Sequence, residues 1–311
     1  MDEGKLQNAW NTRQRLMAQA AAATTCYRLL DAEGDGFPDL WAEWFDGRLL
    51  LQTQRHQPTD MRPMVKAFPG MRSIYWKRLD QRDKESPTWL WGEKVEEPFT
   101  VLENGVKYEI SFTSGYSQGI FLDQRDNRLA IRERISQSEP GSQRVLNLFA
   151  YTCAFSVAAG AGGGIATSVD LSPTYLDWGK RNLQLNGMDP ASHYFVKGDA
   201  FDWLQAFAKK GRKWQGVILD PPTFSRGQVK KVFRVEEDYA ELVKLATQVL
   251  EPGGWMLCCA NTRKVSSFEM EEQVRSGVAQ ARRRLSEFQS VPMPADFTGD
   301  AYLKSFWLDV A

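Results

Sequence analysis

The stretch W-Q-G-V-I-L-D-P-P-T-F, residues 214–224, decides how the second part of the chain is expected to fold. An apolar run ends on an aspartate, and two prolines follow it. Because proline has no N–H to donate to a sheet and restricts the chain direction, a buried strand is predicted to end here and to enter a rigid loop. In an open α/β sheet, ligands bind at the carboxyl ends of the strands. The stretch therefore predicts a ligand site next to Asp220.

Apolar runs and helical segments alternate on both sides of this stretch. Strands are predicted to end near Asn147, at Asp170 and at Asp199, each followed by a helix. The helical segment 172–187 has a capping serine, a proline in its first turn and a glycine at its end. Repeated strand–helix units with continuous apolar strands predict an α/β fold with a doubly wound, mostly parallel sheet. The final run, residues 302–310, is predicted to pair antiparallel at the edge of that sheet.

About the first hundred residues are predicted to form short strands in a smaller α+β unit. Turn signals at Asp46–Gly47 and Asn104–Gly105 favour hairpins, and a helix is expected within 58–68. We therefore divide the chain into a small α+β domain, residues 1–114, which could bind RNA or another substrate, and a larger domain, residues 115–311.

Composition narrows the functional classes. The 39 basic and 39 acidic residues balance, so net charge neither indicates nor excludes a polyanionic partner. The N-terminus lacks the apolar core of a signal peptide, and no run approaches membrane-spanning length. Four cysteines without C-x-x-C spacing and two histidines argue against a zinc site and against a disulfide framework. We expect a reduced, cytoplasmic protein without membrane or metal partners, and either a monomer or a homodimer.

Asp170, Asp199 and Asp220 follow three strands and would meet at one rim of the sheet. The first could accept both ribose hydroxyls of a nucleoside, and the second could accept from an adenine amino group. Each alone could instead cap a helix or lie in a solvated turn. The loop N-L-F-A-Y-T-C-A-F, residues 147–155, lacks G-x-G-x-x-G and so offers phosphates no glycine cradle. S-adenosylmethionine, which has an adenosine but no phosphate, fits this pattern.

Four motifs occur together in the chain: G-I-F-L-D-Q-R-D-N-R (119–128), V-L-N-L-F-A-Y-T (145–152), S-V-D-L-S (168–172) and L-D-P-P-T-F (219–224). In combination they resemble the RlmI/RlmK-like family of bacterial large-subunit ribosomal RNA methyltransferases. The resemblance implies a class I, Rossmann-like methyltransferase fold, S-adenosylmethionine as the methyl donor, and RNA, specifically 23S rRNA, as the substrate.

The resemblance also implies roles for particular residues. The implied cofactor-binding residues are Gln124, Arg125, Asn147, Phe149, Ala150, Tyr151, Asp170, Leu171, Asp199, Ala200 and Asp220. The implied catalytic and target-base residues are Asp220, Pro221, Pro222, Phe224 and Asn261. Among these, Asp170 would bind the ribose, and Phe224 would stack on the base. Arg125 and Arg128 could instead form surface salt bridges.

Two features depart from the family pattern. Cys153 stands where members usually have glycine, and its side chain could crowd the cofactor's amino acid moiety. RlmI-type members also begin with an RNA-binding PUA domain, and we expect none here. RNA affinity would then rest on the small domain and on basic residues beyond the prolines, unless those residues form only a solvated loop. These residues are Arg226, Lys230, Lys231 and Arg234.

The residue at position 261 bears on the chemistry. Methylation of cytosine C5 needs a thiolate that adds to C6, and RlmI-like members have a cysteine where this chain has Asn261. Cys258 and Cys259 lie within an apolar run and are expected to be buried. A 7-methylguanine product is therefore preferred over 5-methylcytosine.

Two alternative functions stay open. The first is a methyltransferase that acts on protein or on a small molecule, since the fold serves many reactions. The second is a non-catalytic RNA-binding or ribosome assembly factor with a decayed cofactor pocket. Cys153 favours this second alternative, whereas the intact Asp170, Asp199 and Asp220 oppose it.

Overall fold

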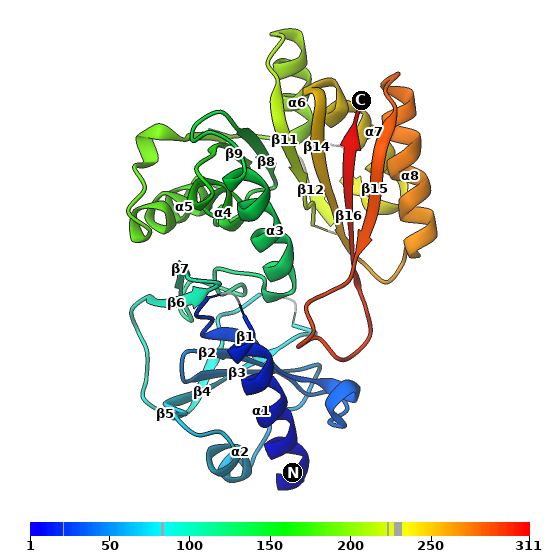
Figure 1. The fold of residues 1–311 in the computed structure, drawn as a ribbon. Helices are drawn as coiled ribbons and strands as arrows, with labels where there is room; N and C mark the ends of the chain where they lie inside the picture. The colour runs from blue at the N-terminus through cyan, green and yellow to red at the C-terminus, as the bar shows by residue number, and fades with distance from the viewer. Residues whose placement is uncertain (21, 82–83, 223, 227–231) are drawn as a thin grey trace. The chain divides into compact units, whose positions relative to one another are not determined.

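The protein is described by a computed structural model that covers residues 1–20, 22–81, 84–222, 224–226 and 232–311. The chain forms two compact units, coloured by residue number in Figure 1. The first unit contains Met1–Arg125 and Pro294–Asp300, and the second contains Asp126–Met293 and Ala301–Ala311. The first unit extends to Arg125, whereas we predicted its boundary at residue 114. It also includes Pro294–Asp300, a segment from near the C-terminus.

The first unit is built on a five-stranded sheet with the order β1-β2-β3-β4-β5 and a separate hairpin, β6–β7. Its strands are β1 (Cys26–Asp31), β2 (Trp41–Phe45), β3 (Arg48–Thr53), β4 (Ser73–Arg78), β5 (Thr88–Gly92), β6 (Phe99–Glu103) and β7 (Val106–Ile110). Its helical segments are α1 (Glu3–Ala18), η1 (Ala32–Asp35), α2 (Arg62–Ala67) and η2 (Leu122–Gln124). Only β3 and β4 run parallel within the sheet, because the helix α2 carries the chain across between them.

Both predicted hairpin turns are confirmed. Asp46 and Gly47 have φ angles of 49° and 85°, and Asn104 and Gly105 have 49° and 79°. Two successive positive φ angles are typical of the type I′ turn, whose twist matches the strands that it joins. The helix α1, in contrast, was not expected from the sequence. It buries only a narrow stripe of a mostly polar segment, so its apolar periodicity is weak.

The second unit contains a seven-stranded sheet with the order β10-β9-β8-β11-β14-β16-β15. Its strands are β8 (Arg144–Leu148), β9 (Ile165–Asp170), β10 (Tyr194–Lys197), β11 (Trp214–Leu219), β14 (Leu250–Asn261), β15 (Leu285–Val291) and β16 (Leu303–Val310). Its helical segments are α3 (Arg125–Ser136), α4 (Ala154–Ala161), α5 (Pro173–Leu185), η3 (Pro190–Ser192), α6 (Ala200–Lys209), α7 (Val235–Gln248) and α8 (Ser267–Gln280). The strands from β10 to β14 are parallel, which is the doubly wound sheet that the sequence predicted.

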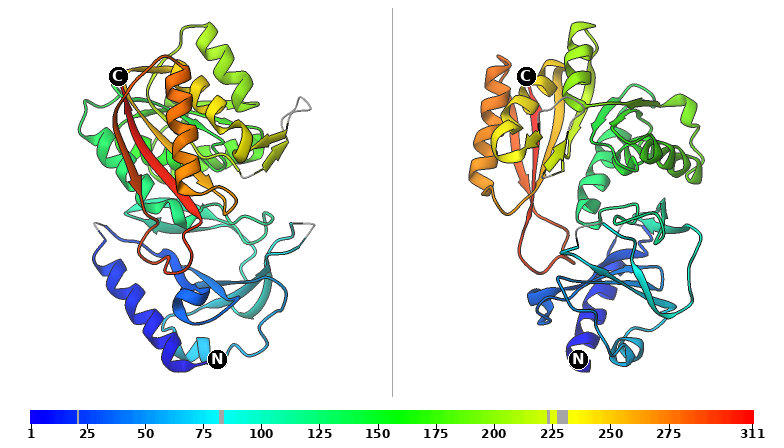
Figure 2. Two further views of the ribbon diagram at one scale, coloured as in Figure 1. Left: turned by 90° about the vertical axis from the view of Figure 1, so that its right-hand side faces the viewer. Right: turned by 180° about the vertical axis from the view of Figure 1, so that it is seen from behind.

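Helices cover both faces of this sheet, and alternate residues of each strand enter different cores. On β14, Met256 and Cys258 face the core that contains residues of α7 and α8, whereas Leu257 and Cys259 face the core that contains residues of α3 and α4. Figure 2 shows α8 against the strands from two further sides. Since side chains alternate along a strand, one apolar run serves two cores, which explains why β14 reads as continuously hydrophobic.

The position predicted for the last strand was wrong. β16 lies between β14 and β15 and pairs antiparallel with both, whereas the edge belongs to β15 (Figure 1). β15 escaped prediction because none of its side chains is fully buried, so its apolar alternation is weak. β16 buries most of its residues, as expected of a strand with neighbours on both sides.

The chain beyond the two prolines was predicted as a loop. It instead forms a short antiparallel pair, β12 (Phe224–Arg226) and β13 (Val232–Arg234). Lys230 and Lys231, which we predicted to contact RNA, lie outside the described residues, as do the side chains of Phe224 and Arg226.

Candidate functional site

The register of the parallel strands brings the predicted acids to one rim. Leu148 of β8 pairs with Val169 of β9 on one side and with Leu219 of β11 on the other. The next residues on β9 and β11 are Asp170 and Asp220. The two acids therefore flank the end of β8, where the order of the strands reverses. In doubly wound sheets this reversal point is where ligands bind.

Asp170 is held in place by the backbone on both sides. One carboxylate oxygen accepts the N–H of Tyr151 at 2.8 Å, and the other accepts the N–H of Ser172 at 2.8 Å. Each oxygen retains a second lone pair, and the residue is only partly buried. Burial raises the pKa of Asp170, and the two N–H groups act against this shift. The result is an oriented carboxylate that can accept a pair of hydroxyl groups.

The loop after β8 carries unusual backbone angles. Phe149, Tyr151 and Cys153 have φ angles of 58°, 48° and 61°, in the left-handed region that non-glycine residues rarely adopt. The loop is fixed by the N–H of Ala150, which donates to the carbonyl of Val169 at 3.0 Å, and by the N–H of Cys153, which donates to the carbonyl of Ala150 at 2.7 Å. Backbone strain of this kind concentrates at ligand-binding sites, because the surrounding structure must maintain it.

Asn147 lies at the end of β8 below this loop. Its side-chain nitrogen donates to Ser156 Oγ at 2.9 Å, and Ser156 Oγ lies 2.8 Å from Ser168 Oγ. The carboxamide oxygen of Asn147 is buried and has no hydrogen-bond partner among the residues that the structure describes. A buried acceptor without a donor is costly, so this oxygen is suited to a donor brought by a ligand or a water molecule.

Asp199 caps α6. One of its oxygens accepts the N–H groups of Phe201 and Asp202 at 2.8 and 3.4 Å. The helix-cap alternative is therefore correct for Asp199, and its contact with adenine stays a prediction. Ala200 is buried at the first position of the helix, and Leu171, beside Asp170, is partly exposed.

Gln124 and Arg125 belong to the first unit, and both are buried there. The guanidinium of Arg125 donates to both carboxylate oxygens of Asp296, at 2.5 and 3.0 Å. This is a buried ion pair, unlike the surface pair that we considered as the alternative. The contacts of Gln124 and Arg125 with the cofactor stay predictions. Arg128 is also buried, with its guanidinium 5.8 Å from the centre of the Phe155 ring.

A buried tyrosine that the sequence did not single out joins the ends of β11 and β14. Tyr239 of α7 donates its hydroxyl to the carbonyl of Cys259 at 2.8 Å, and the carbonyl of Leu219 lies at 3.4 Å. Burial raises the pKa of Tyr239 well above its usual value, so the hydroxyl stays a donor. Asp220 follows Leu219 and is partly exposed. Tyr239 therefore positions the strand end that presents Asp220.

Comparison with known proteins identifies this arrangement. Residues 27–306 match the model of a family described as S-adenosylmethionine-dependent methyltransferase. The chain belongs to this family. The match confirms the expected methyltransferase activity and S-adenosylmethionine as the cofactor.

Particular relatives support the same assignment. The methyltransferase is 32% identical to ribosomal RNA large subunit methyltransferase I of Aeromonas salmonicida, over 91% of this chain and 73% of that protein. It is also 32% identical to ribosomal RNA large subunit methyltransferase K/L of Pseudomonas aeruginosa, over 91% of this chain but only 38% of that protein. A structure of the methyltransferase SMU.776 complexed with SAH has a TM-score of 0.85, with 27% identity, and covers 99% of this chain and 82% of that chain. The resemblance stated from the motifs is thus confirmed.

The cysteines of β14 are unsuited to act as nucleophiles. Cys258 and Cys259 are both fully buried, and burial raises the pKa of Cys258. The sulfur of Cys259 lies 3.7 Å from Ser305 Oγ, inside the core that contains residues of α3 and α4. Asn261, at the end of β14, is exposed. The methyltransferase therefore presents an amide, and neither of these thiols, at the rim.

Cys153 is enclosed by neighbouring residues. Its side chain is fully buried, packs with Ala150 and Leu176, and has its pKa raised to about 12 by that burial. The position has a left-handed φ angle, a backbone conformation that glycine adopts without steric cost. The room for the thiol comes from Gly179 of α5, where a Cβ atom would lie 2.6 Å from the Cβ of Cys153 and would also overlap its sulfur.

We expect Gly179→Ala to destabilise the methyltransferase by about 1–3 kcal/mol, because the added methyl group overpacks the Cys153 side chain. Cys153→Gly in the same chain should recover most of this loss. Urea unfolding of the single and double variants measures both effects. An equal loss in Gly179→Ala and in the double variant would show that the two side chains do not compete for this space.

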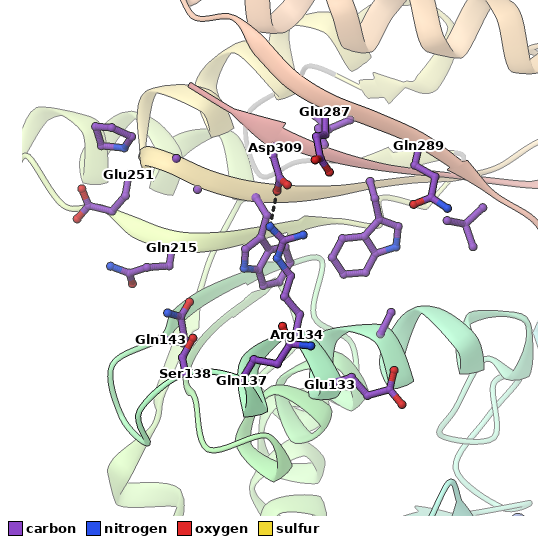
Figure 3. A pocket seen from close by; sticks show the side chains of 18 residues that line it. Glu133, Arg134, Gln137, Ser138, Gln143, Gln215, Glu251, Glu287, Gln289 and Asp309 are labelled. Carbon is purple, nitrogen blue, oxygen red and sulfur yellow. Dashed lines mark hydrogen bonds and ion pairs between the residues drawn. The ribbon is translucent and has the colours of Figure 1, made fainter. Parts of the chain in front are cut away.

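A hollow lies toward the amino end of the parallel strands, away from the rim that carries Asp170 and Asp220, and Figure 3 shows the side chains that line it. It has a volume of about 960 Å³ and lies between α3 and the starts of β8, β11 and β14, with Arg134 paired to Asp309 inside it. No predicted site residue lines it, and cofactors of such sheets bind at the carboxyl ends of the strands.

Within the part of the chain that the structure describes, no group of three or more histidine, cysteine or acidic residues could hold a metal ion. No helix among these residues is long and apolar enough to cross a membrane.

Proposed function

We propose that this methyltransferase modifies a base of 23S rRNA and that it transfers the methyl group to guanine N7 in preference to cytosine C5. The names of the relatives support the substrate class. One observation supports guanine N7 as the methylated atom: at the end of β14, Cys258 and Cys259 are buried, whereas Asn261 is exposed at the rim.

The cofactor is proposed to lie where β8 ends between Asp170 and Asp220. There it supplies an electrophilic methyl group. Asp170 accepts the ribose hydroxyls, since each of its oxygens retains a lone pair after binding one backbone N–H. Asn147 and the strained loop, with Phe149 and Tyr151, shape the methionine end. Asp199, with Ala200, lies by the adenine, and Leu171 packs beside the ribose.

The target base is proposed to bind against Asp220, Pro221 and Pro222, with Phe224 as the stacking residue. The prolines make this segment rigid, and Tyr239 ties the strand that precedes it to β14. A carboxylate at this point can accept hydrogen bonds from the amino and imino edge of a base. The segment thus positions the base for transfer, which is the main requirement when the accepting atom is itself a nucleophile.

Guanine N7 carries its own lone pair, so its methylation needs neither a thiolate nor a general base. Cytosine C5 is different, because a cysteine must first add to C6 to make C5 nucleophilic. Neither Cys258 nor Cys259 can do this from a fully buried position on the strand. Asn261 can offer both a donor and an acceptor to a purine edge.

We expect the protein to methylate unmodified 23S rRNA from a labelled donor and to yield 7-methylguanosine on nucleoside analysis. Cys258→Ser and Cys259→Ser should each retain transfer, while Asn261→Ala should lower kcat/KM about tenfold through the lost contact with the base. Donor binding, measured in parallel, controls for folding. A covalent RNA adduct, or loss of transfer in a serine variant that still binds the donor, would refute the direct mechanism. Label found only in protein or small molecules would refute RNA as the substrate.

A further inference from the structure

The turn that follows β14 is rigid and displays positive charge. The ammonium group of Lys304 donates to the carbonyls of Thr262 and Tyr302, the latter at 3.4 Å. The N–H of Thr262 also donates to the carbonyl of Tyr302 at 3.2 Å. These bonds tie the turn to the start of β16. They hold in place the backbone from which the exposed side chains of Arg263 and Lys264 extend.

The charge of this turn is only partly compensated. Arg263 forms no ion pair within the described ranges, and its guanidinium lies 5.3 Å from the centre of the Tyr302 ring. Lys264 lies 3.8 Å from a carboxylate oxygen of Glu236, and its side chain is 76% exposed, so this pair is weak. Burial, followed by the charge of Arg263, lowers the pKa of Lys304. The two exposed cations therefore remain available to a polyanion.

An exposed aromatic ring follows the two cations. Phe268 lies in the first turn of α8, and 71% of its surface is exposed. The turn 262–266 joins the carboxyl end of β14 to α8, so this ring lies at the same end of the sheet as Asn261. A large apolar ring left in solvent, shortly after two exposed cations in the chain, is suited to single-stranded nucleic acids, because phosphates bind the cations and bases stack on the ring.

We propose that Arg263, Lys264 and Phe268 form an RNA contact surface that binds the single-stranded nucleotides flanking the target base. This rests on the proposed function, and it extends the site from the rim of the sheet along the turn after β14. Arg263 and Lys264 bind phosphates, and Phe268 stacks on an unpaired base. Duplex RNA offers no splayed base to Phe268, so the surface favours loops and single strands over helices.

The test uses the full chain and an unmodified 23S rRNA transcript. Arg263→Ala with Lys264→Ala should weaken binding about tenfold and reduce the dependence of log Kd on log salt by roughly one to two. Phe268→Ala should weaken binding by about 5- to 20-fold without changing that salt dependence. The matched control is Lys209→Ala with Lys210→Ala, which removes two exposed charges at the C-terminal end of α6. This end of α6 leads into the start of β11, so it lies at the amino end of the parallel strands, away from Asn261.

Affinity for S-adenosylmethionine should equal that of the unchanged protein in all three variants, which shows that the fold is intact. If the control weakens RNA binding as much as the Arg263 and Lys264 variant, or if Phe268→Ala has no effect, the surface is wrong while the proposed function stands. If the unchanged protein neither binds nor methylates RNA, both fail. Preferred binding of duplex over single-stranded RNA would also overturn the surface.

Discussion

Replacing Asp170 with alanine is expected to weaken S-adenosylmethionine binding by a factor of about 10 to 150, which corresponds to roughly 1.5–3 kcal/mol. The variant removes the acceptor for two ribose hydroxyls. It also frees the N–H groups of Tyr151 and Ser172, which the carboxylate now orients at 2.8 Å each. Both effects act at the same end of the sheet, on the loops that follow β8 and β9, so this substitution should have the largest effect on donor binding. Isothermal titration calorimetry measures the affinity.

Two further variants sharpen this result. Asp170→Asn keeps the shape of the side chain but replaces one acceptor with a donor, so it should also lose affinity. Asp177→Ala removes an exposed acid of α5 that is paired with Lys180, and it should bind the donor like the unchanged protein. Unchanged affinity in Asp170→Ala would overturn the ribose assignment.

The affinity for the donor should also depend on pH. Burial raises the pKa of Asp170, so its carboxylate takes up a proton at a higher pH than an ordinary aspartate does. As the pH falls, donor binding should therefore begin to weaken at this higher pH.

Replacing Asp296 with alanine is expected to destabilise the first unit by about 3–5 kcal/mol. Asp296 is completely buried, and its carboxylate binds the guanidinium of Arg125 at 2.5 and 3.0 Å and the N–H of Arg28 at 2.8 Å. Its carbonyl also accepts from Arg13 at 2.8 Å. Removal of the acid takes both carboxylate oxygens away from the buried Arg125 guanidinium, and loss of one member of a buried ion pair is costly.

Chemical unfolding followed by tryptophan fluorescence measures this loss. Asp300→Ala, an exposed acid of the same segment, is the matched control and should change stability by less than about 0.5 kcal/mol. The double variant Arg125→Met with Asp296→Leu should recover part of the loss, because it removes the buried positive charge together with the acid. A loss below about 1 kcal/mol in Asp296→Ala would mean that water or another group compensates Arg125.

The sequence by itself determined the alternation of strands and helices in the second unit, both hairpin turns, and the nature of the cofactor. These features depend on neighbouring residues. An Asn104–Gly105 pair favours positive φ angles wherever it occurs, and an apolar run that ends in Asp-Pro-Pro must leave a sheet. The acids at three strand ends then indicated a nucleoside, because parallel strands end at a common rim. The lack of G-x-G-x-x-G in the loop 147–155 indicated that this nucleoside carries no phosphates.

Other features were decided only by the tertiary structure. Asp296 meets Arg125, Gly179 makes room for Cys153, and Tyr239 joins the carbonyl of Cys259 to the end of β11. The placement of β16 inside the sheet belongs to the same class. Each depends on residues far apart in the chain, whose meeting is set by strand register and by the packing of helices on the sheet. The local pattern of apolar and polar residues does not predict such pairings, because each partner would also fit its own segment as an ordinary surface or core residue.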